Sequence, residues 1–479
     1  MVAKIILLFV SIIVVGSLRA ANADTAPVVE RAPEFNAGDN RVSGTPPTAE
    51  VAHYFPHEWT QYQATPEHNA AFEVADDAPA WTKNGVDWRF AAHNALPLAG
   101  GAYQDDPVNT TQRLGFAVGV SAADGMVFAG EGARRVYAID ARTGKEIWAF
   151  ATINEVMNTP IVADGLVFAG AGDTGFSFDT MMKFKNGERI ARGMGFSGYY
   201  ALDEATGEQR WRFDTKGNAM PGAIYIDHVL YFATGDGHVY AVDGRSGKQR
   251  WRADIKGFAS MSSLNALGDL IYVGASDPNF VLALNRHNGK IVWRQTVPGV
   301  ANTGMGDNSP TVDARNGLVI QSTVVDANPK EKTNDLAVFA LDAATGKIKW
   351  QRKLGRGHSP PAYKAGVAMV HDDTVYIGSP VTNELYALSI ADGAERWHLP
   401  IPEAGKNGAG RGSPTYYRGK LYFAAVQTLY RIDPETGHIE GARNLGGRFG
   451  LVNPVIVGGT AYLANSWGWV MAVPLDSVS

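Results

Sequence analysis

The chain has 479 residues, of which 54 are glycine and none is cysteine. The absence of cysteine excludes disulfide bonds, thiolate nucleophiles and cysteine-ligated metals. With 43 basic and 48 acidic residues the net charge is −5, which argues against nucleic acid as a partner because non-specific binding to it needs a basic surface.

Residues 1–23 are predicted to be a secretory signal peptide. Lys4 precedes an apolar run from Ile5 to Val15, and small residues follow up to Ala23, where we expect cleavage. The run is too short to span a bilayer comfortably, and no later segment reaches that length, so no integral membrane segment is expected. We expect a periplasmic or extracellular protein, with loose association with the outer membrane left open.

Residues 24–85 are expected to form an N-terminal extension packed on the main domain. An internal repeat then organises residues 86–479. Its first copy runs from Asp140 through Thr143 and Gly144 to Trp148. The pattern predicts two strands joined by a tight turn, in which glycine adopts a positive φ and aspartate hydrogen-bonds the turn backbone. The glycines of the other copies are Gly207, Gly247, Gly289, Gly346, Gly393 and Gly437, and the last copy has Gly441 in place of the tryptophan.

A second hairpin precedes each motif, so each repeat contains four strands, which is one blade of a β-propeller. Seven motifs give seven blades. Residues 453–473 supply three strands of an eighth, and residues 86–91 supply its fourth, with Trp88 standing in for the missing tryptophan. We therefore predict an all-β, eight-bladed β-propeller closed by pairing of N- and C-terminal strands, with seven blades as the alternative.

Two repeats are lengthened by insertions, near residues 173–197 and 326–334. The first mixes aromatic and methionine side chains with cations. It is expected to cap the channel or form a subunit contact, with a solvated loop as the other interpretation. The second is polar and charged, and we expect a solvated loop there.

The loops that lead into the innermost strands are the candidate site, because loops from every blade converge there. Several cations stand on or just before them, which favours an anionic ligand, although each is also compatible with a solvated turn. Asp307 is the one acid among the aligned positions and is the candidate general acid or base, with ordinary turn chemistry as the alternative. The candidate ligand-binding residues are Lys256, Asn308, Ser309, Arg356, His358, Arg411, Ser413, Arg448 and Asn453.

No competing catalytic motif is present. We find no Ser-His-Asp spacing, no phosphate-binding glycine-rich loop and no His-Glu-x-x-His signature. His358 is a possible ligand or base, but a lone histidine is more often structural. Neither a metal nor a cofactor is expected.

The Ala-x-Asp-x-x-Thr-Gly-x-x-x-Trp motif resembles the tryptophan-docking repeat of the pyrroloquinoline-quinone propeller superfamily over residues 86–479. This resemblance implies the fold more specifically than the function, because the superfamily includes dehydrogenases, an outer-membrane assembly scaffold and a sulfur-compound hydrolase. A quinone-dependent dehydrogenase is expected to need a calcium site, and most alcohol-oxidising members carry a cysteine pair. A scaffold is expected to carry a lipidated cysteine. This chain has no cysteine.

A narrower resemblance is to the tetrathionate hydrolases of acidophilic sulfur oxidisers. It rests on residues 32–38, residues 61–69 and the stretch Gly304-Met305-Gly306-Asp307. The resemblance implies that Asp307 is catalytic, with its carboxyl group near the Gly304 carbonyl. It also implies tetrathionate as substrate, products of thiosulfate, sulfate and sulfur in acidic surroundings, and a homodimer.

Overall fold

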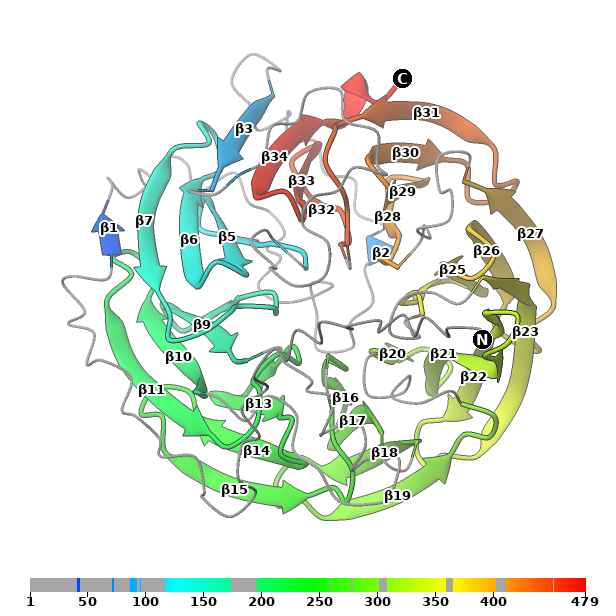
Figure 1. The fold of residues 1–479 in the computed structure, drawn as a ribbon, viewed down its shortest axis with the longest axis horizontal. Helices are drawn as coiled ribbons and strands as arrows, with labels where there is room; N and C mark the ends of the chain where they lie inside the picture. Colours follow the sequence, from blue (N-terminus) through cyan, green and yellow to red (C-terminus); the bar gives the residue numbers. More distant parts are fainter. Residues whose placement is uncertain are drawn as a thin grey trace, which may run out of the picture. The chain divides into compact units, whose positions relative to one another are not determined.

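The computed structural model describes residues 41–43, 71–72, 87–92, 95, 116, 118–173, 196–259, 261–276, 279–300, 308–358, 365–401, 411–450 and 452–479. All of them belong to one compact unit, residues 35–479. Eight sheets surround a central axis in this unit (Figure 1). The predicted eight-bladed β-propeller is confirmed, and the seven-bladed alternative is wrong.

Each blade is a meander of four antiparallel strands. From the innermost strand outward, blade 1 contains β4 (Ser121–Ala123), β5 (Met126–Glu131), β6 (Arg135–Asp140) and β7 (Glu146–Ala151), and blade 2 contains β8 (Ile161–Ala163), β9 (Leu166–Ala171), β10 (Ser197–Asp203) and β11 (Gln209–Thr215). Blade 3 contains β12 (Ile224–Ile226), β13 (Val229–Ala233), β14 (His238–Asp243) and β15 (Gln249–Asp254), and blade 4 contains β16 (Asn265–Leu267), β17 (Leu270–Ala275), β18 (Phe280–Asn285) and β19 (Ile291–Thr296). In the same order, blade 5 contains β20 (Thr311–Asp313), β21 (Leu318–Asn328), β22 (Thr333–Asp342) and β23 (Ile348–His358), and blade 6 contains β24 (Met369–His371), β25 (Thr374–Ser379), β26 (Glu384–Ser389) and β27 (Glu395–Pro400). Blade 7 contains β28 (Thr415–Tyr417), β29 (Lys420–Ala425), β30 (Thr428–Ile432) and β31 (Ile439–Asn444), and blade 8 contains β32 (Val455–Val457), β33 (Thr460–Ala464), β34 (Trp469–Pro474) and β3 (Trp88–Ala91).

Burial follows from the position of a strand in its blade. A second strand such as β5 is buried along its whole length, because neighbouring blades pack on both of its faces. An outermost strand such as β11 has only exposed and half-buried residues, since one edge and much of one face meet solvent. The apolar runs in the sequence therefore mark middle strands, and the mixed polar runs mark outer ones.

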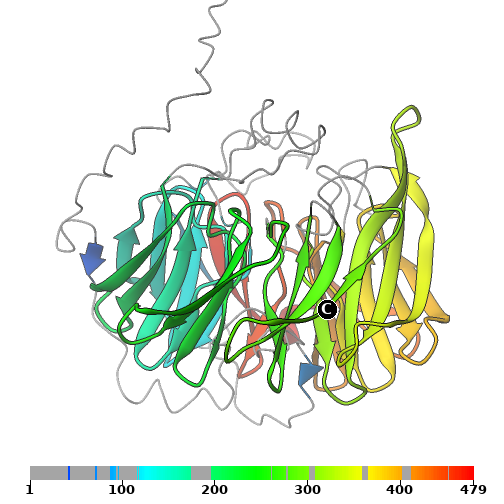
Figure 2. The same cartoon turned by 90° about the horizontal axis from the view of Figure 1, so that it is seen from below.

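Hairpin connections place two kinds of loop at the same end of every blade. The loop leading into the innermost strand (the lead-in loop) lies at the same end as the turn between the second and third strands, because successive strands run in opposite directions. We call this end the lead-in face. Figure 2 shows the long β21–β22 hairpin extending from it.

That hairpin corrects one prediction. The segment near residues 326–334 was expected to be a solvated loop, yet β21 continues to Asn328 and pairs with β22 from Thr333 onward. Val324 and Val325 are buried, and Val300 forms a β-bridge with Val325. The insertion is polar because it lengthens the exposed end of a hairpin. It is solvated as predicted, but it is a β-hairpin and not an irregular loop. The other insertion, near 173–197, lies almost entirely outside the described residues.

The repeat motif forms a latch between consecutive blades. In blade 1 the Asp140 carboxylate accepts hydrogen bonds from the Thr143 amide at 2.7 Å and hydroxyl at 2.8 Å. Trp148, on the outermost strand of blade 1, reaches blade 2, where its Nε1 donates to Glu204 O at 2.8 Å. The indole packs so closely on Gly207 that a Cβ there would lie 2.7 Å from the ring. Gly207 has a φ of 71°, as the turn motif predicts.

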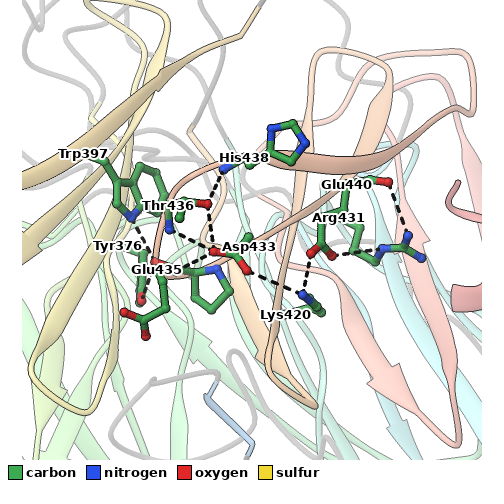
Figure 3. A network of polar contacts seen from close by, with 10 residues as sticks. Tyr376, Trp397, Lys420, Arg431, Asp433, Glu435, Thr436, His438 and Glu440 are labelled. Atoms are coloured by element: carbon green, nitrogen blue, oxygen red, sulfur yellow. Dashed lines mark hydrogen bonds and ion pairs between the residues drawn. The ribbon is translucent and has the colours of Figure 1, made fainter.

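The same latch recurs around the ring. Figure 3 shows the copy in blade 7, where Thr436 donates to Asp433 through both its amide and its hydroxyl at 2.9 Å, and Trp397 of blade 6 donates to Pro434 O at 2.9 Å. Equivalent indole donations at 2.7 to 2.9 Å come from Trp211, Trp251, Trp293 and Trp350.

Blade 8 is completed as the sequence predicts. β3 pairs antiparallel with β34, with Trp88 opposite Ala472. Trp88 then takes the role of the repeat tryptophan, because its Nε1 donates to Ala141 O at 2.9 Å and its ring packs on Gly144. The prediction of closure by N- and C-terminal strands is confirmed.

The seam between blades 7 and 8 is built differently. Gly441 occupies the tryptophan position, and a Cβ there would lie 2.3 Å from the Val478 carbonyl oxygen. Val478 follows the 3-10 helix η5 (Leu475–Ser477). Arg443 of β31 binds both Asp87 and the Ser477 hydroxyl across this seam.

Two short strands from the N-terminal extension also join the propeller. β1 (Arg41–Ser43) adds a fifth strand to the outer edge of β7, and β2 (Ala71–Phe72) pairs in parallel with the innermost strand β28. Packing of the remainder of residues 24–85 stays a prediction. Among the described residues, no helix has the length and apolar character needed to cross a membrane.

Candidate active site

Hydrogen bonds tie each lead-in loop to the next around the axis. Thr159 Oγ1 donates to Gly119 O at 3.3 Å, and the Asn158 amide nitrogen donates to Ala219 O at 2.8 Å. The Ser263 hydroxyl accepts from the Gly222 amide at 3.1 Å. Blades 1 to 4 are thereby joined in sequence where the chain approaches the axis.

The predicted site residues Asn308 and Ser309 continue this series. Ser309 Oγ accepts from the Ser263 amide at 2.9 Å, and Asn308 Oδ1 accepts from the Ala365 amide at 2.9 Å. Their exposed fractions are only 7% and 1%. Both side chains therefore have a structural role between blades 4, 5 and 6, and their contact with substrate stays a prediction. Gly304 and Asp307 lie outside the described residues.

Ser413 and Asn453 are buried at the lead-in loops of blades 7 and 8. The Ser413 hydroxyl donates to Pro414 O at 3.1 Å and, more weakly, to Ala368 O at 3.4 Å. Asn453 is 1% exposed, and its Nδ2 has no hydrogen-bond partner among the described residues. An unsatisfied buried amide is costly, so this group is suited to donate to a ligand or water.

Two predicted cations lie on exposed surface away from the innermost strands. Lys256 follows the outermost strand β15, and its Nζ contacts Asp254 at 2.8 Å. Arg356 belongs to the outermost strand β23 and contacts Asp335 at 3.2 Å. Both are already paired with carboxylates, and Lys256 stands at the outer start of the blade 4 lead-in loop, directly after β15. A ligand role for them stays a prediction.

The expectation that His358 stands directly before an innermost strand is wrong. β23 continues to His358, which pairs with Thr333 and is exposed. The lead-in to β24 is instead residues 365–368, where Ala365 and Val367 are buried. Two other predicted cations, Arg411 and Arg448, are half-buried just before the buried lead-in residues of blades 7 and 8.

Five apolar side chains from five lead-in loops meet at the axis. Their exposed fractions are 8% or less, and they form one cluster separate from the cores between blades. Because the residues come from blades 1, 2, 3, 4 and 6, the cluster spans the axis. We call it the methionine collar: Val118, Met157, Met220, Met261 and Val367.

A cavity of about 20 Å³ adjoins the methionine collar. All five collar residues line it, together with Asn158, Thr159, Ser263 and Ser309. A volume of this size holds about one water-sized group. Ser309 is thus the predicted site residue that the structure places at this cavity, and the collar itself was not anticipated from the sequence.

A buried carboxyl group, Glu131, was also missed by the sequence reasoning. Its side chain is 0% exposed, and Oε2 accepts a hydrogen bond from the Tyr137 hydroxyl at 2.9 Å. Burial raises the pKa of Glu131 to about 7, although Tyr137 and Arg135 act in the opposite direction. Its carbonyl accepts from the Val156 amide at 3.2 Å, next to Met157 of the collar. The only sequence signal is a glutamate at the end of an apolar strand.

No three His, Asp or Glu side chains are grouped as metal ligands would be in the part of the chain that the structure describes. The expected absence of a metal or cofactor stays a prediction.

Comparison with known proteins first defines the class of fold. A repeat-family model described as outer membrane protein assembly factor BamB matches residues 70–190, 195–322 and 236–477. The solved structure of quinohemoprotein alcohol dehydrogenase from Comamonas testosteroni is similar with a TM-score of 0.52 and 14% identity, over 90% of this chain and 82% of that one. These matches agree with the eight-bladed ring and concern the fold alone.

Closer relatives define the family. Tetrathionate hydrolase from Acidithiobacillus ferrooxidans is 38% identical over 440 residues, which cover 88% of this chain and 87% of the relative. Tetrathionate hydrolase from Acidianus ambivalens is 33% identical over 461 residues, covering 88% and 85%. The chain belongs to the tetrathionate hydrolase family, as the narrower sequence resemblance predicts.

Proposed function

We propose that this protein hydrolyses tetrathionate in acidic surroundings outside the cytoplasm. Family membership over most of the chain supports the reaction, and the signal-peptide pattern supports the location. The structural observation that carries the proposal is the anchoring of Asn308 and Ser309. These residues directly follow Asp307 in the chain, and Ser309 lines the cavity at the axis.

The proposed reaction balances with water as the only co-reactant. One tetrathionate and one water give one thiosulfate, one sulfate, one sulfur atom and two protons. Two sulfur–sulfur bonds break. The electron pair of the central bond leaves with the thiosulfate sulfur, and the electron pair of the bond to the other sulfonate stays with the released sulfur atom, while that sulfonate sulfur bonds the water oxygen. The water oxygen is retained in the sulfate.

Asp307 carries protons in this proposal. As a carboxylate it removes a proton from the attacking water, and as a carboxylic acid it protonates the leaving sulfur. A carboxyl group suits either role in acid, because its unperturbed pKa of about 3.9 lies within the working range. The carbonyl of Gly304 is the proposed neighbour of this carboxyl group.

The sulfonate ends of tetrathionate are proposed to bind at blades 7 and 8. Arg411 and Arg448 supply positive charge there, and the buried Nδ2 of Asn453 supplies a hydrogen-bond donor. Lys256, Arg356 and His358 would contribute less, because the first two neutralise Asp254 and Asp335 and all three are exposed.

The decisive experiment is turnover by the purified protein with no quinone added. Tetrathionate is incubated at about pH 4, near the unperturbed carboxyl pKa, and thiosulfate and sulfate are measured by ion chromatography. Asp307→Asn should lower kcat by about 100-fold or more. Asp326→Asn, an exposed aspartate on the adjoining hairpin, is the matched control and should retain full activity. Wild-type activity in Asp307→Asn would remove the catalytic assignment.

We further propose a homodimer, on the basis of the family resemblance, with the aromatic insertion near 173–197 forming part of the contact. Sedimentation velocity of the secreted protein tests this proposal. A single species at the monomer mass of 51.4 kDa or below would contradict it.

A further inference from the structure

We propose that the methionine collar is the binding site for the uncharged sulfane sulfur of the substrate. This inference rests on the proposed function and identifies a second subsite for it. The sulfonates would be held above the axis by cations and amides, while the sulfur chain would point down into the cavity at the axis.

The chemistry of the cavity wall supports this assignment. Met157, Met220 and Met261 come from three consecutive blades and are 1 to 6% exposed. A thioether is polarizable and only a weak hydrogen-bond acceptor, and it donates no hydrogen bond. The collar therefore cannot compensate the desolvation of a sulfonate, which is costly for an unpaired ion. It is suited to a neutral, polarizable atom such as a sulfane sulfur.

The accessibility of the collar and the size of the cavity further restrict which group can bind there. Val118, Met261, Ser263 and Ser309 keep 6 to 8% of their surface exposed, so a small part of the collar and of its polar neighbours stays accessible. The cavity of about 20 Å³ accepts about one water-sized group. The cavity would therefore take one sulfane sulfur from the middle of the chain, between the two sulfonates, and not a whole tetrathionate ion.

Ser309 is one of the polar residues that line this cavity. Ser309 Oγ already accepts from the Ser263 amide at 2.9 Å, so the hydroxyl hydrogen remains for donation in another direction. A sulfur that gains negative charge as the sulfur–sulfur bond breaks would accept it. The collar would therefore hold the neutral sulfur of the ground state, and Ser309 would act on the charge that develops.

The test compares polythionates that differ in their number of sulfane sulfurs. Met261→Gln keeps the side-chain length but makes the wall polar, whereas Met261→Leu keeps it apolar. Met261→Gln should lower kcat/KM for tetrathionate and pentathionate by about tenfold or more, while Met261→Leu stays within about threefold of wild type. Met471→Gln, the same change at a buried methionine in the core between blades 7 and 8, controls for general destabilisation.

A neutral probe separates this inference from the proposed function. Dimethyl trisulfide should bind the wild-type protein in calorimetry, and Met261→Gln should abolish that binding whether or not the protein hydrolyses tetrathionate. If tetrathionate is hydrolysed but Met261→Gln leaves kcat/KM and probe binding unchanged, the collar proposal is overturned alone. If the probe binds at the collar but no polythionate is hydrolysed, the proposed function fails and the sulfur subsite stands.

A further variant covers the case in which Met261→Gln does not fold. Met261→Ala widens the cavity without adding a polar atom, so kcat/KM for pentathionate should rise relative to tetrathionate. An unchanged ratio in a folded Met261→Ala protein would also overturn the proposal.

Discussion

Arg443, on the outermost strand of blade 7, binds Asp87, which lies 356 positions earlier in the chain and directly precedes the outermost strand of blade 8. The two side chains are 26% and 21% exposed, so the ion pair is largely shielded from solvent. It stands at the seam where Gly441 replaces the latch tryptophan. The contact therefore joins the two ends of the propeller where the repeat motif is missing.

Arg443→Ala should reduce the free energy of unfolding by about 2 kcal/mol, because it leaves Asp87 partly buried without its partner. Urea denaturation at neutral pH measures the change. Arg315→Ala is the control, since its pair with Asp372 also crosses between blades but is 72% and 55% exposed. An exposed pair contributes about 0 to 1 kcal/mol. Equal effects of the two substitutions would show that the seam pair has no special role.

The latch predicts different costs for two chemically identical substitutions. Gly144→Ala places a methyl group 2.6 Å from the Trp88 ring, whereas nothing lies within 4 Å of a Cβ at Gly165. Both glycines have a φ near 70°, so the backbone penalty is shared. Gly144→Ala should therefore be more destabilising than Gly165→Ala by about 1 to 3 kcal/mol. Thermal unfolding of both variants measures the difference, and a smaller loss for Gly144→Ala is incompatible with the latch.

The raised pKa of Glu131 predicts that this group contributes most to the free energy of unfolding in acid. Burial raises its pKa from 4.5 to about 7, so the folded protein binds more protons than the unfolded chain between these values. This contribution is fully present below pH 4.5 and is lost as pH rises through 7. Its size is about 3 kcal/mol, from about 1.4 kcal/mol for each pKa unit. In Glu131→Gln this part of the decline in stability from pH 4.5 to 8 should vanish, as urea midpoints across that range would show.

The ion pairs of the turn aspartates contribute to stability with the opposite pH dependence. Arg250 and Ser246 hold the pKa of Asp243 at about 2, so the stabilisation is present above the ordinary value of 3.8 and is lost as pH falls through 2. Asp243→Asn should lower the melting temperature at pH 6 and have little effect at pH 1.5. An equal loss at both pH values would mean that the carboxylate charge is irrelevant there.

Asn308 is predicted to affect turnover because its side chain anchors the backbone. Asn308→Ala removes the acceptor for the Ala365 amide and should lower kcat for tetrathionate by about tenfold, because Asn308 anchors the backbone directly after Asp307, the proposed catalytic residue. Asn308→Asp keeps an acceptor at the same place and should retain most of the activity. The pH profile of kcat separates this positioning role from direct catalysis, since in Asn308→Ala, which adds no titratable group, its shape should stay that of wild type.

The fold was predictable from sequence because its determinants are local and repeated. A turn such as Asp140–Gly144 and a tryptophan such as Trp148 carry both the hairpin and its latch within a few residues. Even the closure by Trp88 follows from the same motif, since one tryptophan was missing from the count and one stood unused near the start of the repeats.

The candidate site was less predictable because its members come from separate blades. Nothing in the spacing of Met157 and Met261 indicates that their side chains meet. His358 was misplaced because β23 runs several residues beyond the usual outer strand, and an added β-strand residue cannot be distinguished from a loop residue in a single polar sequence. The pKa of Glu131 is raised because its side chain is buried, and the local sequence does not indicate that burial.

Pairing of β3 with β34 also constrains how the polypeptide acquires its structure. β3 is among the first propeller strands to be synthesised and β34 is the last, so blade 8 cannot form until synthesis is almost complete. Until then Trp88 and the apolar faces of blades 1 and 7 that blade 8 covers remain exposed, which favours aggregation. A chain shortened by only its final blade would therefore expose two sheet faces, and its half-life should fall far more than the number of deleted residues suggests.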